Sequence, residues 1–357
     1  MPKKDKESCT CSQQNPRLGR VGGQAVMEGV MMKNNKRVAV SVRRDDGRIV
    51  SKVEECTSIK DKHKFLGWPI IRGIVNFIEM LILSFRTLDE SAELAGVIEE
   101  EETKFEKWLK EKFGKSVLDF IMGISLMLGF GLSILLFILL PNLIANACGK
   151  WFNAGEAVQS VISGISKMII FVLYIYLVSL MKEIRRTFEY HGSEHKSIYC
   201  YEKGLELTVE NVRVQSRFHP RCGTSFMFVM MLIGMAFAFA ARSVITYGIG
   251  FVIDNVLLKT LFYTGISLII LLPLVTGVGY EFLRYAGKHD NVFVRVLSAP
   301  GLWMQRLTTR EPTDDMIEVA IRSLKLSLPD EFPDTECDDG GDKPKQTEDN
   351  EADGDKA

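Results

Sequence analysis

Four long apolar runs constrain the fold of this 357-residue chain more than any other feature of its sequence. They cover residues 120–141, 162–181, 226–245 and 260–280. Each is long enough to supply the ~20 apolar residues that cross ~30 Å of hydrocarbon. The sequence therefore predicts an α-helical integral membrane protein with four transmembrane helices. We expect it to lie in the cell membrane and to contact the lipid bilayer.

Two charged residues fall inside these runs, Lys167 and Arg242. Both lie toward the end of a predicted span that is remote from the central loop. A long basic side chain at such a position can reach the membrane interface at modest energetic cost. We therefore expect both residues to be compatible with membrane-spanning helices.

The distribution of lysine and arginine predicts the orientation of the spans. The loop at 142–160 holds only Lys150, and the loop around Asp254 and Asn255 holds only Lys259, whereas the loop at 182–224 holds eight basic residues. Because basic residues are retained on the cytoplasmic side, we expect the central loop and both termini to be cytoplasmic.

Residues 17–60 are expected to form a small cytoplasmic β element. Val38, Val40 and Val42 recur at every second position and so lie on one face, and Asp46–Gly47 offers a hairpin turn before the alternation resumes at Ile49. The preceding stretch, 22–33, is apolar but interrupted by glycines, and we expect an edge strand with a close backbone approach there.

The remaining segments are expected to be helices and tails. Residues 61–115 hold an amphipathic helix at 69–86, expected in the membrane interface or against the bundle, and a charged helix at 99–115. Residues 281–327 are expected to be helical and cytoplasmic, with Thr313 capping a helix whose apolar face is formed by Met316, Val319, Ala320 and Leu324. Residues 1–16 and the acidic stretch 328–357 are expected to be disordered tails.

The central loop carries the clearest chemical signal, an H-x-x-E-H pattern formed by His191, Glu194 and His195. On a helix, residues 191 and 195 lie one turn apart on one face, so both imidazoles can meet one metal ion. Glu194 would lie beside them, placed to take a proton from a water molecule at the metal. This pattern suits a divalent metal, zinc above all. The alternative is a pair of histidines that contact acidic neighbours or lipid headgroups.

A zinc site needs a third ligand for catalysis, and a third and a fourth for a structural role. His219 and Cys222 are spaced so that one turn can present both, and the sequence leaves open whether both bind or only one. Further candidates are Glu202, on the helix face of His195, and Glu281, at the cytoplasmic end of the fourth span. A glycine-rich strand folded against the central loop would also bring Gln24 and Glu28 to the site.

A second polar cluster, Arg306, Thr308, Thr309 and Arg310, could bind a phosphate or a carboxylate. The alternative is a basic surface that meets anionic lipid. Motifs for nucleotide, dinucleotide and serine-hydrolase sites are absent from the sequence. No nucleic-acid partner is expected, because the net charge is −1 and the basic residues follow the membrane pattern.

Several long motifs resemble the YqhQ family of bacterial membrane proteins, over about residues 17–326. They are GGQAVMEGVMMK from Gly22, HGSEHKSIYCYE from His191, SRFHPRCGTSF from Ser216, GYEFLRYAGKHDN from Gly279 and PGLWMQRLTTREP from Pro300. This is a domain-of-unknown-function family described as predicted metal-dependent enzymes. The resemblance therefore implies a metal-dependent enzyme but supplies neither substrate nor reaction.

H-x-x-E-H is also similar to the motif of inverted zinc peptidases, whose third ligand is a downstream Glu. Glu281 would correspond to it by analogy alone.

Three functions follow as hypotheses. The first is a metal-dependent hydrolase, with zinc as the metal, at the cytoplasmic face of the membrane. Glu194 would be its general base, and its substrate would be associated with the membrane. The second is a non-enzymatic scaffold or regulatory protein that has a structural metal or polar site and binds a protein partner. The third is a transporter, for which Pro273, Gly277 and Gly279 could break the fourth span.

Overall fold

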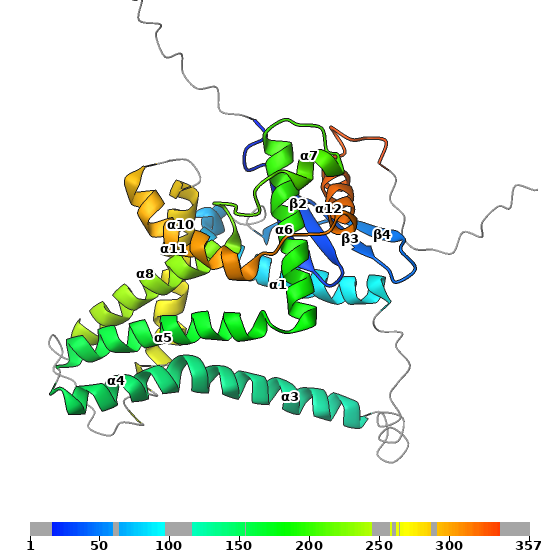
Figure 1. Ribbon diagram of the computed structural model, residues 1–357. Coiled ribbons are helices and arrows are strands. Elements are labelled where there is room, and N and C mark those ends of the chain that lie inside the picture. The colour runs from blue at the N-terminus through cyan, green and yellow to red at the C-terminus, as the bar shows by residue number, and fades with distance from the viewer. Residues whose placement is uncertain are drawn as a thin grey trace, which may run out of the picture.

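The computed structural model of the protein describes residues 16–59, 64–96, 116–153, 155–244, 258, 262–263, 265–286 and 291–335. A four-stranded antiparallel sheet covered by helices forms one part, and long apolar helices form the other (Figure 1). Helix α6 (Lys182–Glu202) leads from the apolar helices to the sheet. The helix expected at 99–115 and most of both expected tails lie outside the described residues.

The sheet is a meander of consecutive strands in the order β1-β2-β3-β4. The hairpin expected around Asp46–Gly47 is confirmed, since Val42 of β3 lies opposite Val50 of β4. The strands are β1 (Val21–Val26), β2 (Gly29–Asn34), β3 (Arg37–Arg43) and β4 (Ile49–Glu55).

The expectation of a single edge strand over 22–33 is wrong. This stretch is a hairpin of β1 and β2, joined by a two-residue turn in which Glu28 adopts a φ of +51°. Because Met27–Glu28 contains none of the residues that favour such turns, the sequence did not reveal it. The expected close backbone approach is present at Gly29, where a Cβ would lie 2.2 Å from the Ser41 carbonyl oxygen.

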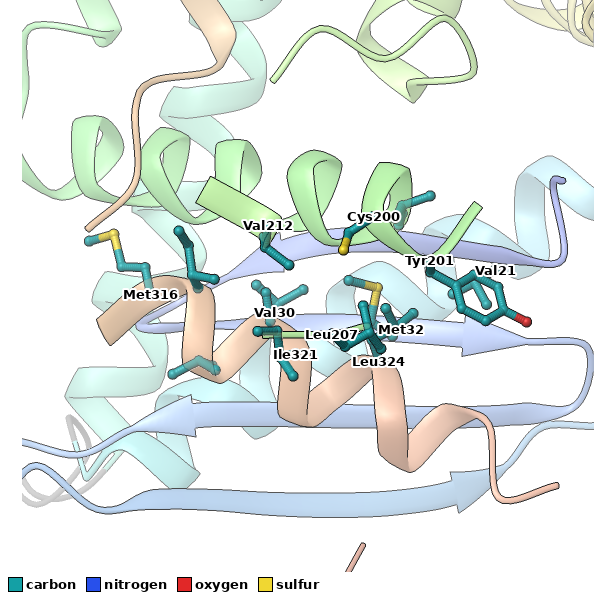
Figure 2. Close-up of a cluster of buried hydrophobic side chains, with 14 of the residues drawn as sticks. Val21, Val30, Met32, Cys200, Tyr201, Leu207, Val212, Met316, Ile321 and Leu324 are labelled. Atoms are coloured by element: carbon teal, nitrogen blue, oxygen red, sulfur yellow. The ribbon is translucent and has the colours of Figure 1, made fainter. Parts of the chain in front are cut away.

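Both faces of the sheet are buried. One face presents Val38, Val40 and Val42 to Leu83 of helix α1 (Ile71–Ala95). The other packs against α6 and helix α12 (Asp314–Ser327), where Val30 and Met32 meet Leu324 (Figure 2). The sheet therefore has a core on each side, which firmly positions α6.

The expected C-terminal helix is present as α12, and its four predicted apolar residues are all buried. Thr313 occupies the N-cap position, but its side chain makes no capping hydrogen bond. The tail expected from residue 328 is wrong for 328–335. Leu328 is buried in the core, Phe332 packs against it, and Glu331 pairs with Arg17 and Arg20.

Helix α1 starts close to the expected place but continues nine residues beyond Arg86. The two arginines of this amphipathic helix form ion pairs within the protein, Arg72 with Glu281 and Arg86 with Glu54. Several large apolar residues of α1 remain exposed, notably Ile82 and Phe85.

Three helical stretches are long and apolar enough to cross a membrane. They are Gly123–Trp151, Ala157–Val178 and Ile269–Ala286, and a shorter apolar helix covers Phe226–Ala241. The first stretch consists of α3 (Ser116–Ile134), the π-helical turn η4 (Leu135–Leu139) and α4 (Leu140–Trp151). The second lies in α5 (Glu156–Val178), and the third in the π-helical turn η6 (Ser267–Leu271) and α10 (Leu272–Ala286). The shorter apolar helix lies in α8 (Gly223–Ser243).

The expected loop at 142–160 is wrong, because the first apolar helix continues through Pro141 to Trp151. Proline lacks an N–H and usually ends or kinks a helix. Here the π-helical turn η4 precedes it, and a local π-bulge accommodates the missing hydrogen bond. Helix α5 starts at Glu156 instead of residue 162, so Lys167 lies in the middle of this helix and not toward its end.

The expected central loop, 182–224, is largely helical, with α6 followed by the short α7 (Val209–Arg213). Helix α11 (Val292–Thr308) and α12 account for most of the expected helical segment at 281–327. Residues 203–222 return the chain from the end of α6 to the start of α8.

Candidate metal centre

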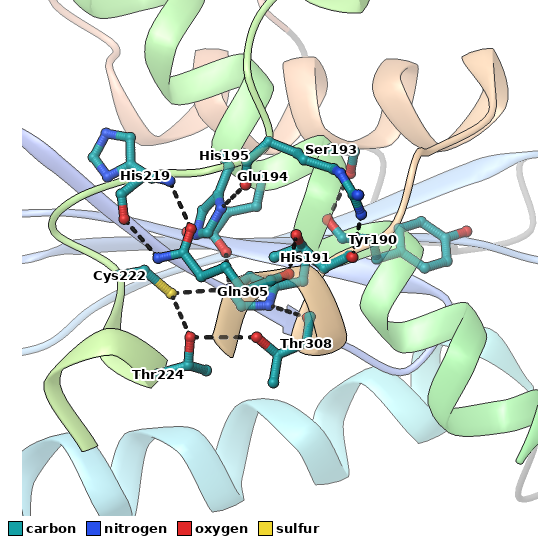
Figure 3. A network of polar contacts seen from close by, with 12 residues as sticks. Tyr190, His191, Ser193, Glu194, His195, His219, Cys222, Thr224, Gln305 and Thr308 are labelled. Carbon is teal, nitrogen blue, oxygen red and sulfur yellow. Dashed lines mark hydrogen bonds and ion pairs between the residues drawn. The ribbon is translucent and has the colours of Figure 1, made fainter. Parts of the chain in front are cut away.

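Helix α6 places the two histidines of the H-x-x-E-H pattern side by side. The ring centroids of His191 and His195 are 4.4 Å apart, as expected for residues one helical turn apart. His195 is almost fully buried and His191 is partly buried. Both imidazoles lie where α6 meets the return segment and the end of α11 (Figure 3).

Cys222 reaches this pair from the N-cap of α8. Its Sγ lies 3.3 Å from Nε2 of His191. One ligand atom each from His191, His195 and Cys222 lies within 4.8 Å of the other two, and this is the group that the described residues offer to a metal ion. The return segment thus brings the Cys222 sulfur, 31 residues away in sequence from His191, to two imidazole nitrogens that α6 already places together.

Backbone carbonyls hold Nδ1, the ring nitrogen opposite Nε2, in both His191 and His195. Nδ1 of His191 lies 2.8 Å from the carbonyl oxygen of Thr308, and Nδ1 of His195 lies 2.5 Å from that of Arg217. A carbonyl oxygen only accepts hydrogen bonds, so Nδ1 carries the proton in both neutral rings and Nε2 keeps its lone pair. Metal-binding histidines are usually oriented in this way.

The Thr308 carbonyl reaches His191 because the chain crosses α6 at Gly192. A Cβ at residue 192 would lie 2.0 Å from the carbonyl oxygen of Arg310. The Arg310 N–H donates to the Phe188 carbonyl, 2.9 Å away, and ties the crossing segment to the helix. Any larger residue at 192 would force the crossing segment, and with it Thr308, away from α6.

Glu194 is buried against strand β1. A Cβ on Gly23 would lie 2.7 Å from Cγ of Glu194, so glycine makes room for this carboxylate. Oε2 of Glu194 lies 3.8 Å from Nε2 of His191. Burial raises the pKa of Glu194 to about 7, although His191 opposes the shift. A carboxyl group with a pKa near neutrality suits proton transfer.

His219 does not join the three-residue group. Its Nε2 lies 3.5 Å from Oε2 of Glu202, and its backbone N–H and carbonyl bind the buried side chain of Gln305 at 2.8 and 2.7 Å. Burial lowers the pKa of His219, and this effect exceeds the opposing influence of Glu202. Of the two additional ligands that were expected, the structure thus places Cys222, and not His219, beside His191 and His195.

Glu202 lies on the far side of His219. Burial alone would raise its pKa, but the contact with His219 and the hydrogen bonds from the Gly19 N–H and Arg221 hold that pKa below the ordinary value. The carboxylate of Glu202 thus stays charged and fixes His219 and Arg221 in place.

Comparison with known proteins gives the family. Residues 68–330 match the family described as "Protein of unknown function (DUF1385)". The chain belongs to this family. It is also 35% identical, over 313 residues, to a protein of Bacillus subtilis (strain 168) named "Uncharacterized protein YqhQ", covering 86% of this chain and 92% of that protein. The resemblance to the YqhQ family is thereby confirmed. No solved structure matches the chain.

Three other candidate residues of this DUF1385 protein have partners elsewhere. Glu281 pairs with Arg72 of α1 at 2.5 Å. The Gln24 side-chain oxygen accepts a hydrogen bond from Ser84, and Glu28 pairs with Arg186 one turn before the histidines. Their participation in the site stays a prediction that these contacts do not favour.

The expected anion-binding cluster is divided by the end of α11. The Thr309 hydroxyl donates to the Gln305 carbonyl, and that of Thr308 lies 3.5 Å from the Thr224 hydroxyl. Arg306 is exposed, whereas the backbone of Arg310 binds α6. The Thr309 hydroxyl is thus bound at the end of its own helix, that of Thr308 lies at the contact with α8, and anion binding stays a prediction.

Sequence reasoning did not single out Gln305, Arg217 or Gly192, whereas Gly23 lies in the stretch for which a close backbone approach was expected. Gln305 and the Arg217 carbonyl hold His219 and His195, and Gly23 and Gly192 permit the close approaches. All four residues lie within the motifs already quoted, and Gln305 is next to Arg306, which was named as a candidate. Backbone carbonyls that accept hydrogen bonds from the histidines leave no signal in a sequence, because every residue has one.

We predict that Gly23→Ala lowers the free energy of unfolding by about 1–3 kcal/mol, because the new methyl group overlaps the Glu194 side chain. Gly22→Ala is the matched control, since a Cβ there meets nothing within 4 Å. Thermal unfolding in detergent measures both. Truncation by Glu194→Ala should reduce the effect of Gly23→Ala in a double-mutant cycle; equal effects in both backgrounds would contradict this contact.

Proposed function

We propose that this protein is a metal-dependent hydrolase, with zinc as the metal, acting at the cytoplasmic face of the membrane. The observation that carries the proposal is the convergence of His191, His195 and Cys222 with both Nδ1 atoms held by carbonyls. Two imidazole nitrogens and a thiolate are ligands that zinc prefers.

The number of ligands favours a catalytic site over a structural one. Structural zinc sites use four protein ligands, whereas catalytic sites use three and keep one position open. His219, the expected fourth ligand, is held toward Glu202 and Gln305. Zinc at such a site supplies a Lewis acid and lowers the pKa of water to near 7.

Glu194 has the placement of a general base. Its carboxylate lies beside His191, and its pKa of about 7 allows it to accept and return a proton near neutral pH. Gly23 and the surrounding core hold the carboxylate in place. Amides, esters and phosphoesters are the substrate classes that this chemistry attacks.

Exposed apolar side chains support a position at the membrane face. Helix α11, whose last residue Thr308 holds His191, exposes Val292, Phe293, Val296 and Trp303. Helix α1 exposes Ile82 and Phe85 beside the same sheet. Such surfaces suit an interfacial helix, and a lipid-associated substrate would reach the site from there.

The proposal includes four membrane spans and cytoplasmic termini. Helix α8 has 21 residues, and we include it as the fourth span because its apolar part, Phe226–Ala241, lies in the middle of the helix, although this part is shorter than the apolar stretches of the other three spans. The excess of basic residues between α5 and α8 favours a cytoplasmic location for α6 and the metal centre.

A structural metal site is the second candidate. The three ligands connect α6 with the start of α8, and a metal there would hold parts of the chain together without catalysis. The protein would then act as a scaffold. Zinc content and the effect of Glu194 distinguish the two functions.

We predict about one zinc per purified chain, and its loss when His191 and His195 are both changed to Ala or when Cys222 is changed to Ala, because only two ligands or fewer remain. His219→Gln should retain zinc, since this residue lies outside the ligand group. Inductively coupled plasma mass spectrometry measures the content. A native chain without zinc, even after zinc is supplied, would overturn the metal site.

We predict that Glu194→Gln lowers turnover by about 10²–10⁴-fold while zinc content stays at the native level, because the amide cannot accept the proton. Glu189→Gln, on the same helix, is the control. Hydrolysis of a panel of amides, esters and phosphoesters by the native protein supplies the assay. Unchanged turnover in Glu194→Gln would contradict the assigned role, and zinc without turnover on the panel would favour the scaffold.

We predict that a cysteine introduced at Lys150, at the end of α4, reacts with an impermeant maleimide in intact cells. A cysteine at Lys203, at the end of α6, should react only after lysis. The unmodified chain gives the background from native cysteines. The reverse pattern would invert the proposed orientation.

A further inference from the structure

A cavity of about 410 Å³ lies among the apolar helices, apart from the metal centre. Residues of α4, α5, α8 and α10 line it, and these helices are labelled on the left of Figure 1. This volume falls within the range of small-molecule sites in proteins. Four methionines contribute much of the apolar wall: Met168, Met230, Met231 and Met235. Methionine side chains are flexible and adapt to ligands of varied shape.

Five residues with polar side-chain groups also line the cavity: Asn142, Ser160, Ser163, Lys167 and Tyr263. The Ser163 hydroxyl donates to Oδ1 of Asn142 at 2.9 Å, which fixes the amide and leaves its N–H donors out of this bond. Lys167 lies at the middle of the 23-residue helix α5. An ammonium group and an amide thus line a cavity whose walls are otherwise mostly apolar.

Among the described residues, no carboxylate acts on Lys167. Ionisable residues in the middle of a membrane helix are expensive and typically pair with another charge or serve a ligand. The other polar residues that line the cavity carry no charge, so an anion supplied by a ligand would offset the charge of this lysine.

We propose that this cavity binds an anionic amphiphile. The negatively charged head meets Lys167 and Asn142, and the hydrocarbon tail lies against the methionines. A long-chain fatty acid and an anionic phospholipid share this chemistry. This site goes beyond the proposed hydrolase, since none of its residues belongs to the metal centre.

Native mass spectrometry of the full chain in neutral detergent tests the proposal, with oleate, dioleoyl phosphatidylglycerol and oleyl alcohol as probes. At least one of the two anions should bind saturably, one per chain. Oleyl alcohol has the same tail without the charge and should bind at least about tenfold more weakly. Binding of oleate alone identifies a carboxylate ligand, and binding of the phospholipid alone identifies a headgroup phosphate.

Lys167→Met should weaken binding of the anion at least about tenfold, to the level of the alcohol, whereas Lys167→Arg should retain it. Lys150→Met removes the same charge outside the cavity and should behave as the native chain. If Lys167→Met does not fold, Asn142→Leu serves in its place and should weaken binding severalfold.

The proposal is overturned if neither anion binds saturably to the native chain, or if the alcohol binds as well as the anions. Unchanged anion binding in a folded Lys167→Met, or in Asn142→Leu when it is the variant used, also overturns it. Zinc content measured on the same samples separates failure of this site from failure of the metal centre.

Discussion

The close approach of two chain segments to helix α6, at Gly23 and at Gly192, is the constraint on which the rest of the structure depends. At Gly23, strand β1 lies against the Glu194 side chain, and at Gly192 the segment after α11 crosses the helix. A side chain at either position would overlap atoms already there. These contacts fix α6 between the sheet and the C-terminal segment, and thereby orient the histidines.

The site forms where the sheet-containing part meets the apolar helices. Helix α6 supplies both histidines, the N-cap of α8 supplies Cys222, and the end of α11 supplies the carbonyl that orients His191. Because these groups come from separate elements, the site exists only when both parts of the protein are in place. A metal-dependent function at this junction would therefore be coupled to how the apolar helices are anchored.

Local patterns predicted several elements well. Alternating valines predicted the β3–β4 hairpin, and the apolar face of α12 followed from the spacing of Met316 and Leu324. Other elements were predicted less well. The first apolar run was expected to end at residue 141, but the helix continues through Pro141 after a π-helical turn, and Met27–Glu28 forms a turn without the usual turn residues. Neighbouring structure overrode local preference in both places.

The sequence by itself determined the long apolar helices, the small β element and the pairing of His191 with His195, because helical and strand periodicity act over a few residues. Only the tertiary structure decided that Cys222 joins them while His219 turns to Glu202, and that Glu281 pairs with Arg72. These choices depend on contacts between residues far apart in the chain and on backbone carbonyls, which every residue carries and no sequence pattern distinguishes.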